Sequence, residues 1–305
     1  MYSLAHLTLQ ESHRTMSKLA VHAIDIFRHL ASTGTRGRIM QKFLAGLLKV
    51  IHPRGKVVDE NLSLAYPDSP KQWRKDIREA MYDNLAWTIT EILALQRKPS
   101  QVFDWVKTVR NIELADSLID TKRGVVFMSG HFGNWEIMAS WYAQYTKIRG
   151  HQMYVVAQGI HDNDISAYID GLRKNMGVET LPSDYSVQKY ARLLKKGNHI
   201  ALLNDVAGTG KMIVPFMGHD ATNMPGPAIM AMLSGSPIIP VCMYRNAPFE
   251  HELEFFPPIE MPEESLPREE RLRRIILECN LAIEGFIRKR PELWFWLHNR
   301  WKRRN

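Results

Sequence analysis

Residues 129–136 read Ser-Gly-His-Phe-Gly-Asn-Trp-Glu and place an imidazole and a carboxylate five positions apart. A carboxylate bonded to one ring nitrogen fixes the histidine tautomer, and the second nitrogen can then take a proton from an alcohol. We therefore expect His131 to act as a general base and Glu136 to orient it, with a substrate hydroxyl as the nucleophile. A structural histidine at a strand end is the alternative interpretation.

The residues around this pair must bring it together. Each residue of a regular helix turns the chain by about 100°, which would hold His131 and Glu136 apart. Gly133 can adopt conformations that other residues avoid, and Asn134 is a suitable N-cap for a following helix. The apolar run 125–128 predicts a buried strand just before the pair. Because ligands of open α/β sheets bind beyond the carboxyl ends of strands, we expect a site at this edge.

Strand-like and helix-like segments alternate after residue 100, which predicts an α/β fold: a mostly parallel central sheet flanked by helices, with amphipathic helices at the N-terminus. We expect residues 59–305 to form a single α/β domain and residues 1–58 a basic, amphipathic region that associates with a membrane. Further strands are expected at 153–156, 200–203 and 238–243, with an edge strand at 253–256. Helices are expected at 70–95, 135–145, 165–176, 187–196 and 269–290.

The N-terminal region combines apolar stripes with unopposed positive charge. No acidic residue lies between Asp25 and Asp59, whereas seven Lys and Arg residues do. Each basic residue near an anionic membrane contributes about 1 kcal/mol to binding. Two ordinary helices packed on a core, with a solvated basic face, are the alternative. One predicted stripe consists of Ile39, Phe43, Leu44, Leu47, Leu48 and Ile51.

The overall composition fits a folded protein of formal net charge +8, for which an anionic partner is plausible. Segment 221–244 carries no Asp, Glu, Lys or Arg, but its four prolines predict loop, short helix and strand. We therefore expect no transmembrane helix. The two cysteines, Cys242 and Cys279, lack metal-ligand spacing and favour a reducing compartment.

Three other patterns carry weaker functional hypotheses. The run 161–164, His-Asp-Asn-Asp, has possible ligands for a metal-dependent phosphoesterase, but such clusters more often cap a helix. The Gly-Thr-Gly-Lys at 208–211 lacks the frame of a phosphate loop. Aromatic and basic residues crowd 286–304, which suits single-stranded nucleic acid or a membrane interface, whereas a buried aromatic cluster is favoured for Trp294 and Trp296. We expect no metal, no cofactor and no nucleic acid.

The motif at 129–136 resembles the first motif of the late acyltransferases of lipid A biosynthesis, within the glycerolipid-acyltransferase superfamily. Three further blocks, at 61–67, 216–227 and 291–302, resemble later motifs of the family in the same order. The resemblance implies that an acyl chain moves from acyl carrier protein or acyl-CoA to a hydroxyl of a membrane lipid, most simply a lipid A precursor. It implies a peripheral or interfacial position on the cytoplasmic face of the inner membrane.

The resemblance also assigns residues. His131 would be the general base and Glu136 its partner, while donors near the glycine-rich turn would stabilise the oxyanion. Among the expected substrate-binding residues, Arg173 and Asp205 follow from the resemblance. Gly133 and Asn134 follow from the turn, and Lys211 is expected to contact an anionic group of the acceptor. The chain departs from the family at Gln158 and Val206, which leaves the acceptor open: another glycolipid or a lysophospholipid is the alternative. A thioesterase and a non-enzymatic membrane-binding module are further alternatives.

Overall fold

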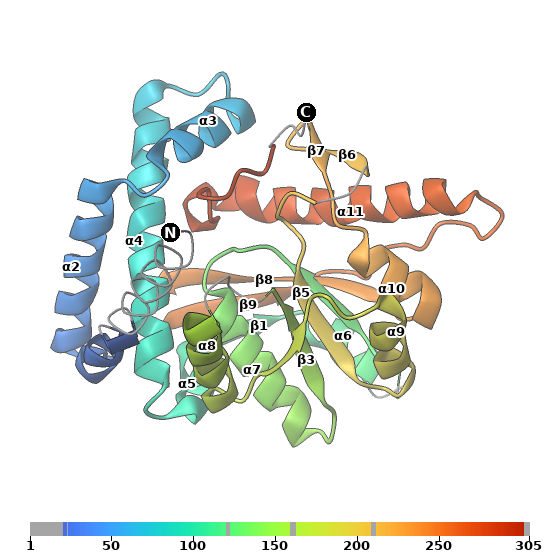
Figure 1. The fold of residues 1–305 in the computed structure, drawn as a ribbon, viewed down its shortest axis with the longest axis horizontal. Coiled ribbons are helices and arrows are strands. Elements are labelled where there is room, and N and C mark those ends of the chain that lie inside the picture. Colours follow the sequence, from blue (N-terminus) through green and yellow to red (C-terminus); the bar gives the residue numbers. More distant parts are fainter. Residues whose placement is uncertain (1–20, 23, 120–122, 159–162, 209–211, 302–305) are drawn as a thin grey trace, which may run out of the picture.

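The computed structural model describes residues 21–22, 24–119, 123–158, 163–208 and 212–301. Its centre is a seven-stranded sheet in the order β1-β9-β8-β2-β5-β3-β4 (Figure 1). All neighbouring strands are parallel except β8 and β9, so the predicted mostly parallel sheet is confirmed. The strands are β1 (Val106–Arg110), β2 (Val126–Ser129), β3 (Met153–Ala157), β4 (Glu179–Pro182), β5 (His199–Leu203), β8 (Ile238–Ala247) and β9 (Glu250–Phe255). A separate hairpin pairs β6 (Ile213–Phe216) with β7 (His219–Thr222).

Helices cover both faces of the sheet. The described helices are α2 (Thr35–Ile51), α3 (Gly55–Ala65), α4 (Lys71–Leu95), α5 (Val102–Trp105), α6 (Ile112–Ile119), α7 (Trp135–Ile148), α8 (Asn163–Asn175), α9 (Val187–Lys195), α10 (Gly226–Ser234) and α11 (Arg268–Lys289). One hydrophobic core unites residues of α9, α10 and α11, and the other unites residues of α5, α6 and α7. Side chains of a strand alternate between faces. Accordingly Val126 and Met128 enter the first core, and Val125 and Phe127 the second.

Burial on both faces explains which strands the sequence revealed. Strand β2 is buried throughout, and its unbroken apolar run is the pattern expected of a central parallel strand. The segment expected to be an edge strand, 253–256, is instead part of β9, which lies between β1 and β8. That expectation is wrong because the true edge strands, β1 and β4, are short and mostly polar, and periodicity did not reveal them.

The N-terminal helices α2 and α3 lie against the long helix α4, at one side of the sheet (Figure 1). The domain boundary expected at residue 58 falls inside α3, so one helix runs through it. Within the part of the chain that is described, no helix is long and apolar enough to cross a membrane.

Candidate active site

The turn between β2 and α7 has the conformation that the sequence predicts. Gly133 adopts φ +61°, and a Cβ at this position would lie 1.8 Å from the carbonyl oxygen of Met243. Only glycine fits such a position. Asn134 then caps α7, because its side-chain oxygen accepts a hydrogen bond from the backbone N–H of Ile137 at 3.2 Å. The turn therefore sets His131 just beyond the strand and Glu136 in the first turn of the helix.

The carboxylate bonded to the imidazole is Asp205, not Glu136. His131 Nδ1 lies 2.8 Å from Asp205 Oδ1, and the backbone N–H of His131 donates to Oδ2 of the same carboxylate at 2.7 Å. The indole Nε1–H of Trp294 donates to Oδ2 as well, at 2.8 Å. Asp205 is fully buried directly beyond β5, whereas 26% of the His131 side chain is exposed. The expectation that Glu136 bonds to the ring is wrong.

Glu136 instead forms an ion pair with Arg173. Arg173 Nη2 lies 2.6 Å from Glu136 Oε1, and Nε lies 3.0 Å from Oε2, so the guanidinium holds the carboxylate in a two-pronged geometry. Arg173 comes from the last turn of α8, which brings it against the first turn of α7. The pair thus joins the first turn of α7 to the last turn of α8. Sequence reasoning named all four residues but paired them differently.

The charges of the site favour an ionised Asp205 beside the histidine. Burial opposes ionisation, but the interactions with His131 and Trp294 outweigh it and hold the pKa of Asp205 well below its ordinary value. For His131 burial lowers the pKa, and the charge and hydrogen bond of Asp205 reverse the effect and raise it. Burial lowers the pKa of nearby His298 to about 4, so this ring is neutral at pH 7. An ionised carboxylate can only accept, so Nδ1 of His131 must donate to it.

His131, Asp205 and His298 also present ligand atoms within 4.8 Å of one another, the one such cluster among the described residues. The oxygens of Asp205, however, already accept three hydrogen bonds. These contacts fit a hydrogen-bonded acid–base pair better than a metal site. Of the run proposed as metal ligands, His161 and Asp162 lie outside the described residues, and Asp164 lies in the first turn of α8.

A cavity of about 490 Å³ opens at this edge of the sheet, between α7 and α10. His131, Glu136 and Arg173 line it together, with Ser129 and Asn204. The rest of the wall is mainly apolar, and it includes Phe127, Met138, Tyr142, Met153, Val155, Val156, Tyr190, Leu202, Ile229, Met230, Val241 and Leu253. Its size lies within the ~300–1,000 Å³ of small-molecule sites. A cavity with a few polar groups and a mainly apolar wall suits an alkyl chain with a reactive polar head.

Several expected substrate contacts are not made in this arrangement. Neither Gly133 nor Asn134 lines the cavity, and Asn134 is fully buried. The expected oxyanion donors of the turn are already occupied: the N–H groups of His131, Phe132 and Gly133 donate to Asp205, to the Gly130 carbonyl and to the Leu293 carbonyl, respectively. The turn is therefore structural and its first three N–H groups cannot reach a substrate. Lys211 lies outside the described residues.

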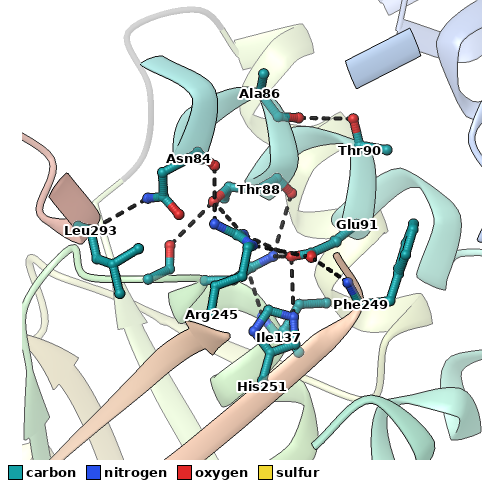
Figure 2. Close-up of polar contacts among 12 residues, drawn as sticks. Asn84, Ala86, Thr88, Thr90, Glu91, Ile137, Arg245, Phe249, His251 and Leu293 are labelled. Carbon is teal, nitrogen blue, oxygen red and sulfur yellow. Dashed lines mark hydrogen bonds and ion pairs between the residues drawn. The ribbon is translucent and has the colours of Figure 1, made fainter. Parts of the chain in front are cut away.

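A buried polar network on α4 holds this turn from behind. Thr88 donates to the Gly133 carbonyl at 3.2 Å, and Glu91 accepts the side-chain amide of Asn134 at 2.8 Å. Figure 2 shows Glu91 between Arg245 and His251, with the Arg245 guanidinium 2.8 Å from the carboxylate. The charges of Arg245 and His251 outweigh the effect of burial and keep the pKa of Glu91 well below its ordinary value.

Sequence reasoning missed this network. Its one sequence signal is the spacing of polar side chains at 84, 88 and 91, which lie on one face of a helix.

The C-terminal segment closes the site from the other side. Trp294 and Trp296 are fully buried, which confirms the aromatic cluster favoured for them from sequence. The backbone N–H of Phe295 donates to the His131 carbonyl at 2.9 Å, and Trp294 reaches Asp205. The C-terminal block of the chain thus belongs to the same site as the motif at 129–136.

Comparison with known proteins shows the family of the chain. Residues 26–303 match the family described as bacterial lipid A biosynthesis acyltransferase. The lipid A biosynthesis lauroyltransferase of Escherichia coli (strain K12) is 22% identical over 264 residues, which cover 84% of this chain and 82% of the relative. The palmitoleoyltransferase of the same strain and the lipid A biosynthesis acyltransferase of Shigella flexneri are each 23% identical over 258 residues, covering 82% of this chain and 79% of the relative. Since the match spans nearly the whole chain, the protein belongs to the bacterial lipid A biosynthesis acyltransferase family.

Proposed function

We propose that this protein transfers a fatty acyl chain from an acyl thioester, on acyl carrier protein or coenzyme A, to a hydroxyl of a lipid A precursor. The observation that carries the proposal is that His131, bonded to Asp205, lines a mainly apolar cavity of about 490 Å³. Such a cavity can hold the acyl chain while the thioester carbonyl lies near the imidazole. The relatives named for acyl transfer to lipid A support the same reaction.

The proposed chemistry uses the free nitrogen of His131. Asp205 accepts from Nδ1, which leaves Nε2 as the acceptor for the proton of the lipid hydroxyl. The oxygen attacks the thioester carbonyl to give a tetrahedral oxyanion. When this intermediate collapses, the C–S bond breaks, the ester remains on the lipid and the thiolate takes up the proton from the imidazolium. General-base catalysis of this kind contributes about 10²–10⁴-fold to the rate.

We assign Glu136 and Arg173 to the same step in a different role from that expected from sequence. Both line the cavity, and the ion pair fixes the guanidinium in its wall. Arg173 then is the candidate to stabilise the oxyanion, since the N–H groups of His131, Phe132 and Gly133 are occupied. Loss of a single oxyanion donor costs an enzyme about 10²–10³-fold in rate. Glu136 is therefore a positioning residue that acts through Arg173.

We further propose that α2 places the protein on an anionic membrane. Its outer face is apolar although it is exposed: Ile39 is 63%, Phe43 60%, Leu47 44%, Val50 81% and Ile51 62% exposed. Arg36, Arg38 and Lys42 of the same helix are exposed, as are Arg54 and Lys56 shortly after it. An apolar stripe flanked by cations is typical of helices that lie in a membrane interface. Of the stripe predicted from sequence, Leu44 and Leu48 pack against the cores, as ordinary packed helices would have them. That alternative does not explain why the five apolar side chains given above are exposed.

The membrane proposal is tested by flotation with anionic vesicles. The variant Phe43→Ser with Val50→Ser should lose most of its vesicle binding, because it removes two of the most exposed apolar side chains. Leu233→Ser, which changes a side chain of α10 that is 42% exposed, serves as the control. Equal binding of both variants and the unchanged protein would reject a role for α2.

The acyl-transfer proposal is tested by incubating the protein with an acyl thioester and a lipid A precursor, followed by mass spectrometry of the lipid. We expect one added acyl chain, and we expect His131→Ala to abolish the product without a large change in thermal stability. Free fatty acid in the absence of any lipid product would indicate a thioesterase. Loss of a phosphate from the lipid, prevented by a chelator, would indicate the phosphoesterase. The same lipids from cells with and without the gene would identify the acceptor.

A further inference from the structure

Helix α9 carries an unusual one-sided charge. Lys189, Arg192 and Lys195 lie on it and Lys196 follows as its C-cap, and all four are exposed. Positions 189, 192 and 196 fall on one face of a helix. The helix itself has no acidic residue, and nothing in the described part of the chain forms an ion pair with any of the four. We call these four residues the α9 cationic strip.

The opposite side of α9 lines the cavity that is proposed to hold the acyl chain. Tyr190 and Val187 line that cavity, and Tyr185, just before the helix, does so too. Lys189 of the strip contacts a residue of the cavity wall, because its ammonium group lies 4.1 Å from the centre of the Tyr185 ring. A macromolecule that binds to the cationic strip would therefore lie beside the cavity. The strip is separated from the core by one helix thickness, about 10 Å.

The position of the strip points to a soluble partner and not to the membrane. Helix α2, with the exposed apolar face, lies at the left of Figure 1, and α9 lies at the right, on the far side of the sheet. A membrane bound to α2 leaves α9 facing away from it. The strip also lacks the exposed large apolar side chains that accompany the charges of α2. Membrane binding needs both features, so the strip fits a protein surface better than a lipid surface.

We infer that the α9 cationic strip is the docking surface for an acidic carrier protein that delivers the acyl chain as a thioester. This inference rests on the proposed acyl transfer and names the donor of that reaction. Four exposed cations without an ion-pair partner in the described part of the chain, three of them on one helix face, complement a cluster of carboxylates. Such rim charges raise the rate and specificity of encounter. Coenzyme A is small and would bind at the cavity opening without contacting the whole strip. The strip therefore distinguishes the two donor classes.

The test compares donors in a variant with the strip reversed. Arg192→Glu/Lys195→Glu/Lys196→Glu leaves Lys189 and the cavity wall unchanged. With an acyl carrier protein as donor, we expect KM to rise about 10-fold or more and kcat to change little, an effect that fades at high salt. With the same acyl chain on coenzyme A, and for the lipid acceptor, KM should stay the same. Lys71→Glu/Lys75→Glu/Lys107→Glu is the matched control, because it reverses three exposed lysines outside the cavity wall.

The outcomes separate the hypotheses. An unchanged KM for the carrier-protein donor, an equal rise for the coenzyme A donor, or a rise for the lipid acceptor would each overturn the docking surface. Reduced flotation of the α9 variant with anionic vesicles would assign the strip to the membrane instead. If the protein does not use coenzyme A thioesters, the dissociation constant of the unacylated holo-carrier protein is measured in place of the coenzyme A comparison. The α9 variant must then bind this carrier protein more weakly than the control variant does. No transfer from either donor by the unchanged protein would refute the proposed function itself.

Discussion

The substitution Glu91→Gln tests whether the buried network on α4 stabilises the protein. Glu91 is fully buried, and its carboxylate lies 2.8 Å from Arg245 Nη2, which is itself only 7% exposed. Removing the negative charge leaves the guanidinium buried without a counter-charge, which typically costs about 3–5 kcal/mol. Domains are stable by only ~5–15 kcal/mol, so the change should be large in equilibrium denaturation by urea at pH 7. We expect a much lower midpoint with an unchanged slope.

Two comparisons make this prediction specific. Glu270→Gln removes a carboxylate at the same 2.8 Å from an arginine, Arg274, but on an exposed helix surface, and should cost at most about 0.5 kcal/mol. Glu91→Gln combined with Arg245→Met removes both charges and should recover part of the loss. A loss below ~1 kcal/mol for Glu91→Gln would refute the reasoning, because the buried arginine would then need no partner.

The pH dependence of the same variant has a defined sign. Because the folded pKa of Glu91 is lowered, its stabilisation is fully present above the unfolded value near 4.5 and is lost as the pH falls through the folded pKa. The stability difference between the unchanged protein and Glu91→Gln should therefore be constant near neutral pH and shrink only in acid. A difference that disappears between pH 6 and 8 would assign the effect to another group.

The remaining predictions concern the site. In Asp205→Asn the rate of acyl transfer should fall about 10²–10⁴-fold. The acid limb of the pH–rate profile should also move to lower pH, because the substitution removes the group that raises the pKa of His131. An acid limb that stays in place would contradict the pairing of His131 with Asp205. Trp294→Phe removes an N–H donor to this carboxylate and should slow transfer about 10-fold, whereas Trp296→Phe, whose indole donates to a backbone carbonyl at the same 2.8 Å, should leave the pH profile alone. Gly133→Ala should abolish folding or transfer, because the added methyl meets a backbone carbonyl at 1.8 Å; soluble, fully active protein would refute this.

Elements that are buried on two faces could be predicted from the sequence. The central strands β2, β5 and β8 and the helices α4 and α11 are long or continuously apolar, and their positions agree with the predicted ranges within a few residues. The short strands β1 and β4 at the sheet edges could not be predicted in this way. They are held by pairing with β9 and β3, respectively, which depends on distant segments and leaves little trace in local periodicity.

The residues of the site could be predicted, but which of them bond to each other could not. His131, Glu136, Arg173 and Asp205 all line the site or support it. The spacing of the motif indicated His131 and Glu136, whereas the family resemblance indicated Arg173 and Asp205. The spacing within the motif suggested a local partner for the imidazole. Contacts that join α4 to the turn cross 43–46 positions of the chain, and no local pattern carries them.

The pairing of His131 with Asp205 follows from sheet register. Strands β2 and β5 are parallel neighbours in which Ser129 is level with Leu203. Two residues further along each strand, the chain therefore brings His131 and Asp205 side by side at the carboxyl edge. Gly130 provides the space, because even a Cβ there would lie 3.0 Å from Asp205 Oδ2.

The sheet register thus explains why the imidazole of His131 bonds to Asp205 and not to Glu136, which is closer in sequence. Glu136 lies in the first turn of α7, which Asn134 caps, so the start of the helix at Trp135 fixes its separation from His131. Of two carboxylates near one imidazole, the one on the neighbouring strand can hold Nδ1, and the one on the helix is free to hold a cation in the cavity wall. In this protein the strand–turn–helix motif therefore contributes to two separate pairs, His131 with Asp205 and Glu136 with Arg173, and the partner of the imidazole follows the neighbouring strand.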